Sequence, residues 1–144
     1  MTTVPVSFKL KCTWVSNPIT VDIQCDGKSL WTGEIDSEND VPCNLEIEDG
    51  DHELSIVVTG HGKHNIIWND KTNKVDKHTI LELVDLEMDS ISVYEVVCTR
   101  SRWYPVMDPD FVEARIQRDG KPPEEWERSV TFGVNGTWTM PFST

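Results

Sequence analysis

The sequence predicts an all-β protein, an antiparallel β-sandwich of jelly-roll-like form with one short helix near residues 109–118. Several short runs alternate strictly between apolar and polar residues, as strands do when they bury one face. Turn-forming dipeptides separate these runs about every ten residues. About eight to ten short strands spaced in this way are typical of a sandwich.

The first strands show the alternation most clearly. Residues 6–14 place five apolar side chains on one face and four polar side chains on the other. The same pattern returns at residues 21–25. Asp26-Gly27 follows directly, and this dipeptide favours a tight hairpin that folds residues 29–35 back onto the preceding strand.

Two further dipeptides predict hairpins. Asp49-Gly50 is expected to fold residues 45–48 onto residues 54–58, with His52 at the solvent end of the second strand. Asn135-Gly136 lies between two alternating runs near the end of the chain and gives the same prediction.

The middle of the chain is less regular. Residues 37–40 read as a polar loop, and residues 61–78 as a long loop or a weak hairpin. At the start of residues 79–93, both the odd and the even positions are apolar. This pattern indicates a strand covered on both faces or a strand with a bulge. Asp89-Ser90 is expected to turn the chain, and residues 94–99 to form another strand.

One helix is expected. Asp108 followed by Pro109 matches an N-cap and a first helical position, and Gly120 matches a helix end. The helix would lie within residues 100–129, a loop and short-helix excursion from the sandwich.

The chain of 144 residues is expected to form a single domain, residues 1–144. Its four cysteines show no Cys-x-x-Cys spacing, so reduced thiols in or near the core are expected, with one disulfide as the alternative. They are Cys12, Cys25, Cys43 and Cys98.

The charge and hydropathy of the chain limit the classes of partner that it can bind. A formal net charge of −12 repels nucleic acid and anionic membrane surfaces at long range. The first residues lack the basic start and apolar run of a signal peptide, and no stretch approaches the ~18 apolar residues of a membrane span. We therefore expect synthesis in a cytoplasm and no nucleic-acid or membrane partner.

A set of short motifs, in a fixed order, spans residues 50–142. The set comprises His52-Glu53-Leu54-x-Ile56, Asp76, Ile80, Asp85, Asp89-Ser90-Ile91, Tyr104-Pro105, Phe132-Gly133-x-Asn135-Gly136-Thr137-Trp138 and Phe142. By these motifs the chain resembles small virion β-sandwich proteins of tailed, cyanophage-like bacteriophages. Their core is similar to calcium-dependent, xylan-binding carbohydrate-binding modules. Val134 departs from the pattern, which has a second tryptophan there.

The resemblance implies a virion structural protein, made in the host cytoplasm, that serves as a capsid decoration or as a tail-fibre or baseplate component. Implied partners are other virion proteins of the capsid or tail and host-surface polysaccharide. A homo-oligomer such as a trimer suits the symmetry of virion positions. The alternative is a free-standing, calcium-assisted carbohydrate-binding module.

Aromatic residues near loops or strand ends are the candidate glycan contacts, because a flat ring packs on the C–H face of a sugar. They are Trp31, Trp68, Trp103 and Tyr104. Trp14 and Trp138 lie in apolar alternations and are expected in the core. Trp126 and Phe111 are the candidate partner-interface residues, since aromatics among polar residues suit interfaces.

Calcium is the one candidate cofactor, and the resemblance suggests it. Asp70 and Asp76 are the candidate ligands, with a solvated polar loop as the alternative. Neighbouring lysines would weaken a divalent site there. His61 and His64 have a spacing that suits zinc, but further ligands are missing.

An enzyme is not expected. The sequence has no nucleophile elbow, no zinc-protease motif and no phosphate-binding loop, and no pair of carboxylates is placed as a glycosidase requires.

Overall fold

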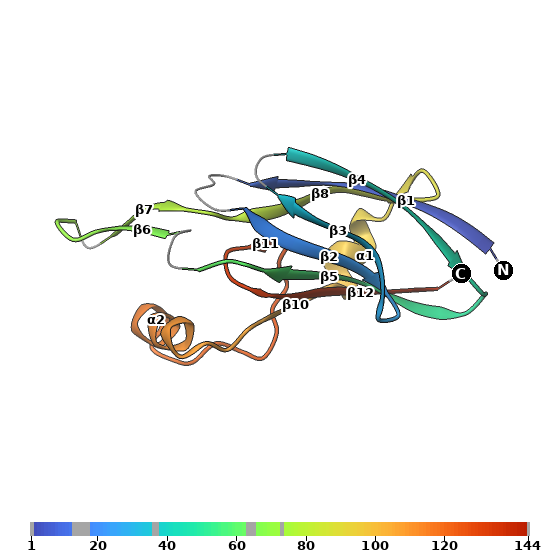
Figure 1. Cartoon of the computed structure of the whole chain (residues 1–144). Coiled ribbons are helices and arrows are strands. Elements are labelled where there is room, and N and C mark those ends of the chain that lie inside the picture. The colour runs from blue at the N-terminus through green and yellow to red at the C-terminus, as the bar shows by residue number, and fades with distance from the viewer. Residues whose placement is uncertain (1, 13–17, 36–37, 63–65, 73, 144) are drawn as a thin grey trace.

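The computed structural model describes residues 2–12, 18–35, 38–62, 66–72 and 74–143. Two antiparallel sheets pack face to face around one core, as the sequence predicts (Figure 1). In chain order the elements are β1 (Thr2–Cys12), β2 (Ile19–Cys25), β3 (Lys28–Ile35), β4 (Glu38–Ile47), β5 (Asp51–Thr59), β6 (Ile66–Asn69), β7 (Lys74–His78), β8 (Leu81–Met88), β9 (Ile91–Ser92), α1 (Tyr94–Arg100), β10 (Arg102–Pro105), α2 (Pro109–Asp119), β11 (Thr131–Phe132) and β12 (Gly136–Ser143).

Sheet A has the order β11-β8-β1-β4, with β9 paired to β8, and sheet B has the order β10-β12-β5-β2-β3. Strands β6 and β7 form a separate ribbon. The ribbon and α2 project from one end of the sandwich, and both chain termini lie at the opposite end (Figure 1). The chain passes repeatedly from one sheet to the other, so residues far apart in sequence meet on each face.

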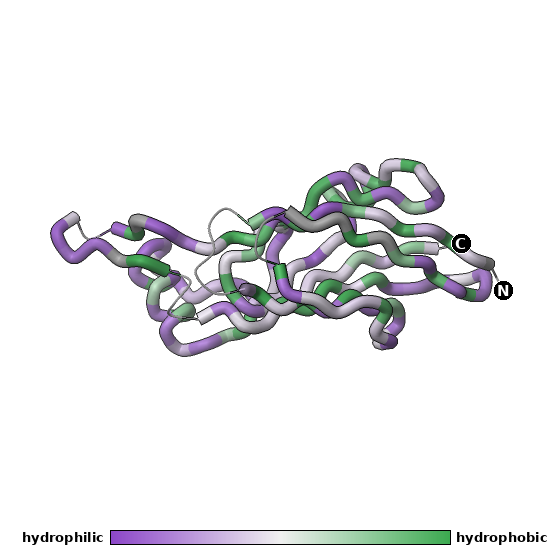
Figure 2. Tube along the Cα trace, turned by 45° about the horizontal axis from the view of Figure 1, so that its top comes forward, coloured by the Kyte–Doolittle hydropathy of each residue, from purple (hydrophilic) through white to green (hydrophobic). Residues whose placement is uncertain are grey.

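Alternation along the strands builds the core. Ile19, Val21 and Ile23 of β2 face inward and are fully buried, while the residues between them are half-buried on the outer face. Trp138 is also fully buried, as predicted. Trp14 lies outside the described residues. Figure 2 shows hydrophobic and hydrophilic segments alternating along the strands and a hydrophilic tip on the β6–β7 ribbon.

Two of the predicted turns are true hairpins. Asp26 and Gly27 have φ angles of 52° and 82°, and Asp89 and Ser90 have 54° and 64°. Positive φ at both central residues suits the twist of paired strands, and the turns join β2 to β3 and β8 to β9. The bulge predicted in β8 lies at Asp85, whose φ is 55° and where the pairing with β1 shifts.

The other two predicted hairpins are wrong. Asp49-Gly50 connects β4 in sheet A to β5 in sheet B, and Asn135-Gly136 connects β11 in sheet A to β12 in sheet B. Of these four residues only Gly50 has a positive φ, so neither dipeptide has both positive φ values that a two-residue hairpin turn of the primed type requires. An arch between the two sheets gives the same apolar alternation as a hairpin.

Residues 94–100 form helix α1, so the strand expected at 94–99 is wrong. Val93, Val96 and Val97 face the core at helical spacing, and α1 packs against β8 of sheet A and β12 of sheet B. Burial of these valines between the two sheets outweighs the preference of valine for strands. Residues 38–40, expected in a loop, belong to β4.

Helix α2 begins and ends as predicted. The Asp108 carboxylate accepts a hydrogen bond from the Asp110 amide at 2.9 Å, and Gly120 has a φ of 77°. Strands β6 and β7 pair as the weak hairpin that was one of the two expectations for residues 61–78. No described helix is long and apolar enough to cross a membrane.

All four cysteines are free thiols. Cys25 is buried, and Cys12 and Cys43 are half-buried. Cys98 is exposed on α1, so its expected place near the core is wrong.

Candidate functional site

The outward face of sheet B carries two rows of side chains that run across the strands. From β10 to β3, the first row is Tyr104, Thr137, Val57, Asp22 and Thr32, and the second is Arg102, Thr139, Ser55, Gln24 and Ser29. We call these residues the sheet B face. They point outward because their neighbours along each strand, such as Trp138 and Ile56, are buried in the core.

Small side chains occupy the centre of this face. Thr137 and Thr139 of β12 lie beside Val57 and the buried Ser55 of β5, and the larger Tyr104 and Arg102 stand at the β10 edge. Neither α1 nor α2 packs extensively on the outer side of β5, β2 or β3. A ligand can therefore approach the middle of the described sheet closely.

At one edge, the chain adds a further short segment beside β10. The Trp103 amide donates to the Glu127 carbonyl at 2.8 Å, and the Glu127 amide donates to the Trp103 carbonyl at 2.9 Å. This antiparallel bridge places Trp126 beside Tyr104 on the outward side. Both aromatic rings are half-buried and so remain partly accessible.

Two arginines pack on Trp126. The guanidinium carbons of Arg102 and Arg128 lie 4.3 Å and 5.4 Å from the centre of its ring, respectively. Arg102 also reaches the Tyr104 hydroxyl at 3.5 Å, and Arg128 donates to the Ser101 carbonyl at 2.7 Å. We call Tyr104, Trp126, Arg102 and Arg128 the aromatic–arginine cluster.

At the other side of the face, Asp22 collects three hydrogen bonds. Its Oδ1 accepts from Ser29 at 2.6 Å and from Thr32 at 3.3 Å, and its Oδ2 accepts from Gln24 at 2.7 Å. The hydrogen bonds from Ser29 and then Gln24 are the main reason that the pKa of Asp22 lies below its ordinary value. We call these four residues the Asp22 cluster, and its carboxylate is ionised at neutral pH.

The predicted glycan-binding aromatics do not all reach this face. Trp103 is 2% exposed and stacks on Phe132 with ring centres 4.4 Å apart. Its position on the inward side of β10 makes the prediction of an exposed sugar platform wrong. Trp31 is half-buried on edge strand β3, where its ring covers Gly33. Trp68 lies in β6, but its side chain is outside the described part.

The predicted interface residues lie near the cluster. Phe111 of α2 is half-buried beneath Arg115, whose guanidinium carbon is 5.0 Å from its ring centre. Arg115 also bonds Glu127 at 3.3 Å, which ties α2 to the segment bearing Trp126. Phe111 is therefore linked through Arg115 and Glu127 to the segment that carries Trp126.

The predicted calcium ligands Asp70 and Asp76 belong to the β6–β7 ribbon. Asn69 Oδ1 already accepts from the Lys71 amide at 2.9 Å and from the Thr72 amide at 3.2 Å, and Asp70 is exposed in the same turn. The side chain of Asp76 lies outside the described part. No three metal-ligating side chains converge in the described ribbon.

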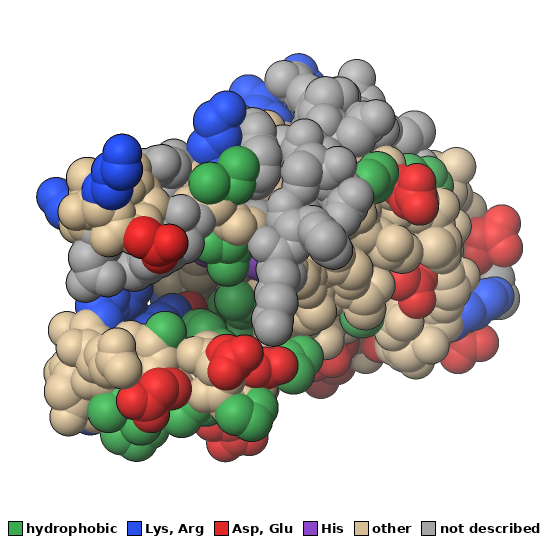
Figure 3. Space-filling view, turned by 60° about the vertical axis from the view of Figure 1, so that its left-hand side comes forward, with side chains coloured by type: hydrophobic (Ala, Val, Ile, Leu, Met, Phe, Trp, Pro, Cys, Tyr) green, Lys and Arg blue, Asp and Glu red, His purple; other side chains and the backbone are tan. Residues whose placement is uncertain are grey.

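The surface is hollowed between the lysine-bearing ribbon and the acidic helix α2 (Figure 3). Partly exposed apolar side chains occur on the ribbon, at Ile66, Ile67 and Val75, and near α2, at Val106 and Met107.

Cys25, Asp26 and His52 bring three ligand atoms within 4.8 Å of one another, but their bonding opposes a metal. His52 donates from Nδ1 to Asp26 and from Nε2 to the Glu48 carbonyl, both at 2.6 Å. Since both acceptors require a proton, the ring is an imidazolium with no free lone pair. Burial, reinforced by the Asp26 charge, raises the pKa of Cys25 to about 11. The group is an ion pair that holds the β2–β3 turn on β5.

A second group of polar contacts, around His61, has a structural role. Asn135 accepts from the His61 amide at 2.8 Å and donates to the His61 carbonyl at 3.0 Å. His61 Nε2 donates to the Thr79 carbonyl at 3.1 Å. Burial, with a smaller effect of neighbouring His78, lowers the pKa of His61. The predicted zinc partner His64 lies outside the described residues.

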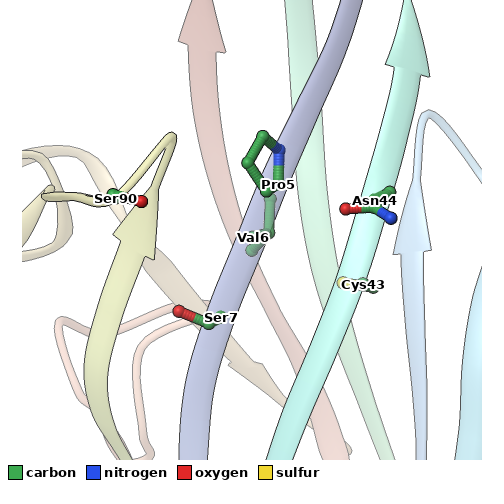
Figure 4. A pocket seen from close by; sticks show the side chains of 6 residues that line it. All are labelled: Pro5, Val6, Ser7, Cys43, Asn44 and Ser90. Atoms are coloured by element: carbon green, nitrogen blue, oxygen red, sulfur yellow. The ribbon is translucent and has the colours of Figure 1, made fainter.

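An open depression of about 380 Å³ lies on the outer side of sheet A, next to the β8–β9 turn (Figure 4). It is lined by Pro5, Val6, Ser7, Cys43, Asn44 and Ser90. None of these six described lining residues is charged or aromatic, so they offer little chemistry for a specific ligand.

Sequence reasoning missed Asp22, Arg102 and the alignment of their rows. Period-2 alternation does identify both as outward-facing, but the order of strands in sheet B cannot be read from the chain. The isolated bridge that brings Trp126 to β10 has no sequence signal of its own.

The comparison with solved structures bears on the architecture. No model of a known protein family matches the sequence, and the search of curated proteins found no match. Among solved structures, the chain matches vCBM60 in complex with galactobiose, with a TM-score of 0.55 and 11% sequence identity. The match covers 96% of this chain and 97% of that chain. At this identity the likeness is one of fold, and the chain has the β-sandwich fold of a carbohydrate-binding module.

Proposed function

We propose that this chain is a non-catalytic glycan-binding module and that the sheet B face, with the aromatic–arginine cluster at its edge, receives the sugar. The observation that carries the proposal is the partly exposed pair Tyr104 and Trp126 beside an outward face of hydroxyl and amide groups. Fold similarity to vCBM60, which was solved in complex with galactobiose, supports it.

The chemistry of the face suits a neutral sugar. Aromatic rings offer flat apolar area to the C–H face of a pyranose, and hydroxyl and amide groups exchange hydrogen bonds with its hydroxyls. Hydrolysis would require a second carboxylate and a general acid with a raised pKa. The pKa of Asp22 is shifted in the opposite direction, which favours binding over catalysis.

A glycan array followed by calorimetry tests the proposal. We expect binding to at least one neutral polysaccharide, and a loss of about three- to tenfold in affinity for Tyr104→Thr, because a stacked ring contributes about 1 kcal/mol. Threonine keeps the strand preference at this position. Glu82→Gln on the outer face of sheet A is the control and should bind as the wild type does. No binding to any glycan would contradict the proposal.

Calcium dependence stays a prediction, with Asp70 and Asp76 as its candidate ligands. The same calorimetry in calcium and in EDTA measures it directly. Equal affinity in both conditions would remove calcium from the proposal and leave the sheet B face as the site.

We further propose that the module works as a virion component of a tailed bacteriophage, a capsid decoration or a tail-fibre or baseplate part, with Phe111 near its contact with other virion proteins. Trp126, the other predicted interface residue, is assigned to the sugar instead. The ordered motifs from His52 to Phe142 support this setting. A trimer in the virion stays a prediction. The protein should remain on purified, salt-washed particles, and its absence there would favour the free-standing module instead.

A further inference from the structure

The sheet B face differs chemically between its two sides. At the Asp22 cluster, the Ser29 and Thr32 hydroxyl protons are both directed at the Asp22 carboxylate, and one Gln24 amide proton is as well. Their oxygens therefore remain as acceptors. This side is rich in acceptors, and its one formal charge is negative.

The β10 side offers donors and ring surface. The Tyr104 hydroxyl accepts from Arg102, so its own proton is free to donate. The arginine guanidinium groups supply further donors next to the ring of Trp126. A polyol, which both donates and accepts, can satisfy both sides at once.

The distance between the two sides is fixed by the sheet. Tyr104 and Asp22 occupy one row, separated by the strands β12 and β5. With Trp126 one step beyond Tyr104, the row from Trp126 to Asp22 spans about four strand spacings of ~4.8 Å, or roughly 19 Å. A pyranose unit of an extended chain is about as long as one such spacing.

We infer that the sheet B face binds an extended, uncharged oligosaccharide of about four units that lies across the strands, from Trp126 and Tyr104 at one end to Asp22 and Gln24 at the other. This inference rests on the proposed function and assigns its ligand class and direction. An anionic chain is disfavoured, because the Asp22 carboxylate would meet the far end of it. Calcium is disfavoured there too, since one carboxylate is a weak basis for a divalent site.

Chain length is the first test. We would titrate the wild-type protein with matched di- and tetrasaccharides of β-linked xylose, glucose or galactose, choosing the sugar that the array identifies. The tetrasaccharide should bind at least about tenfold more tightly than the disaccharide, since only the longer chain reaches the Asp22 cluster. Equal affinities would overturn the inference.

Two variants test the two ends of the proposed binding site separately. Asp22→Asn should weaken tetrasaccharide binding more than disaccharide binding and so remove most of the gain from chain length. Tyr104→Thr should weaken both ligands. Glu82→Gln is again the control for charge, and urea unfolding checks that each variant folds. If Asp22→Asn behaves as Glu82→Gln does, the assignment of Asp22 is wrong.

The outcomes distinguish the two proposals. Absence of binding to every glycan contradicts the proposed function itself. Glycan binding that depends on Tyr104 but not on chain length or Asp22 contradicts only this inference. Binding that is independent of Tyr104 as well keeps the glycan-binding role but places the sugar elsewhere on the protein.

Discussion

At the scale of single residues, the ion pair of His52 and Asp26 joins the β2–β3 turn to strand β5. The Asp26 carboxylate and then the Glu48 carbonyl raise the pKa of His52 above 6.5, and His52 lowers the pKa of Asp26 below 3.8. Sequence reasoning placed His52 at the solvent end of its strand but did not find its partner. Asp26 lies 26 positions away and reaches it only because β2 pairs with β5.

The pair makes stability depend on pH in both directions. A raised histidine pKa contributes stability fully below about 6.5, and this contribution is lost as pH rises through the folded pKa of His52. A lowered aspartate pKa contributes fully above about 3.8, and this contribution is lost as pH falls through the folded pKa of Asp26. The pair should therefore stabilise most between these values.

Urea unfolding across pH measures this effect. Asp26→Asn should flatten the decline of unfolding free energy above pH 6.5, because asparagine keeps the turn, which requires positive φ, but removes the charge. A variant with the same pH profile as the wild type would show that the ion pair is not responsible.

Gly136 is required by packing at the edge of the candidate site. A Cβ there would lie 2.6 Å from the Tyr104 carbonyl oxygen and 2.8 Å from the Trp103 ring. We expect Gly136→Ala to cost about 1–3 kcal/mol in unfolding free energy through overpacking. Gly62→Ala, where a Cβ meets no atom of the described residues within 4 Å, is the control and should be nearly neutral. Equal midpoints in urea would contradict the packing account.

At the scale of elements, local signals succeed where the interaction is local. The N-cap at Asp108, the positive-φ turn at Asp26 and Gly27, and the bulge within residues 79–93 are all properties of neighbouring residues. The Asp49-Gly50 and Asn135-Gly136 dipeptides failed as hairpins, because the choice between pairing within a sheet and crossing to the other sheet depends on distant strands.

Helix α2 has no buried residue, so its cap should matter locally. We expect Asp108→Ala to cost about 1 kcal/mol of local helix stability, while Asp108→Asn keeps an acceptor and costs less. Hydrogen exchange of the amides of residues 112–119 measures this. Unchanged exchange in Asp108→Ala would show that contacts such as that of Arg115 with Glu127 hold the helix without the cap.

At the scale of the whole molecule, the sandwich and its core followed from alternation alone. The candidate site did not, because it consists of the outward residues of five strands whose order in the sheet is a tertiary property. Tyr104 was identified from the chain for its aromatic ring. Its neighbours Thr137, Val57 and Asp22 carry no signal beyond their position in an alternating run.

The central claim is that a glycan binds across the outward face of sheet B. Amide chemical-shift mapping by NMR during titration with the array-selected tetrasaccharide tests it most directly. The account predicts the largest shifts in one band across the strands, at Trp126, Tyr104, Thr137, Val57 and Asp22. Shifts confined to the β6–β7 ribbon around Asp70, with this band unchanged, would contradict it.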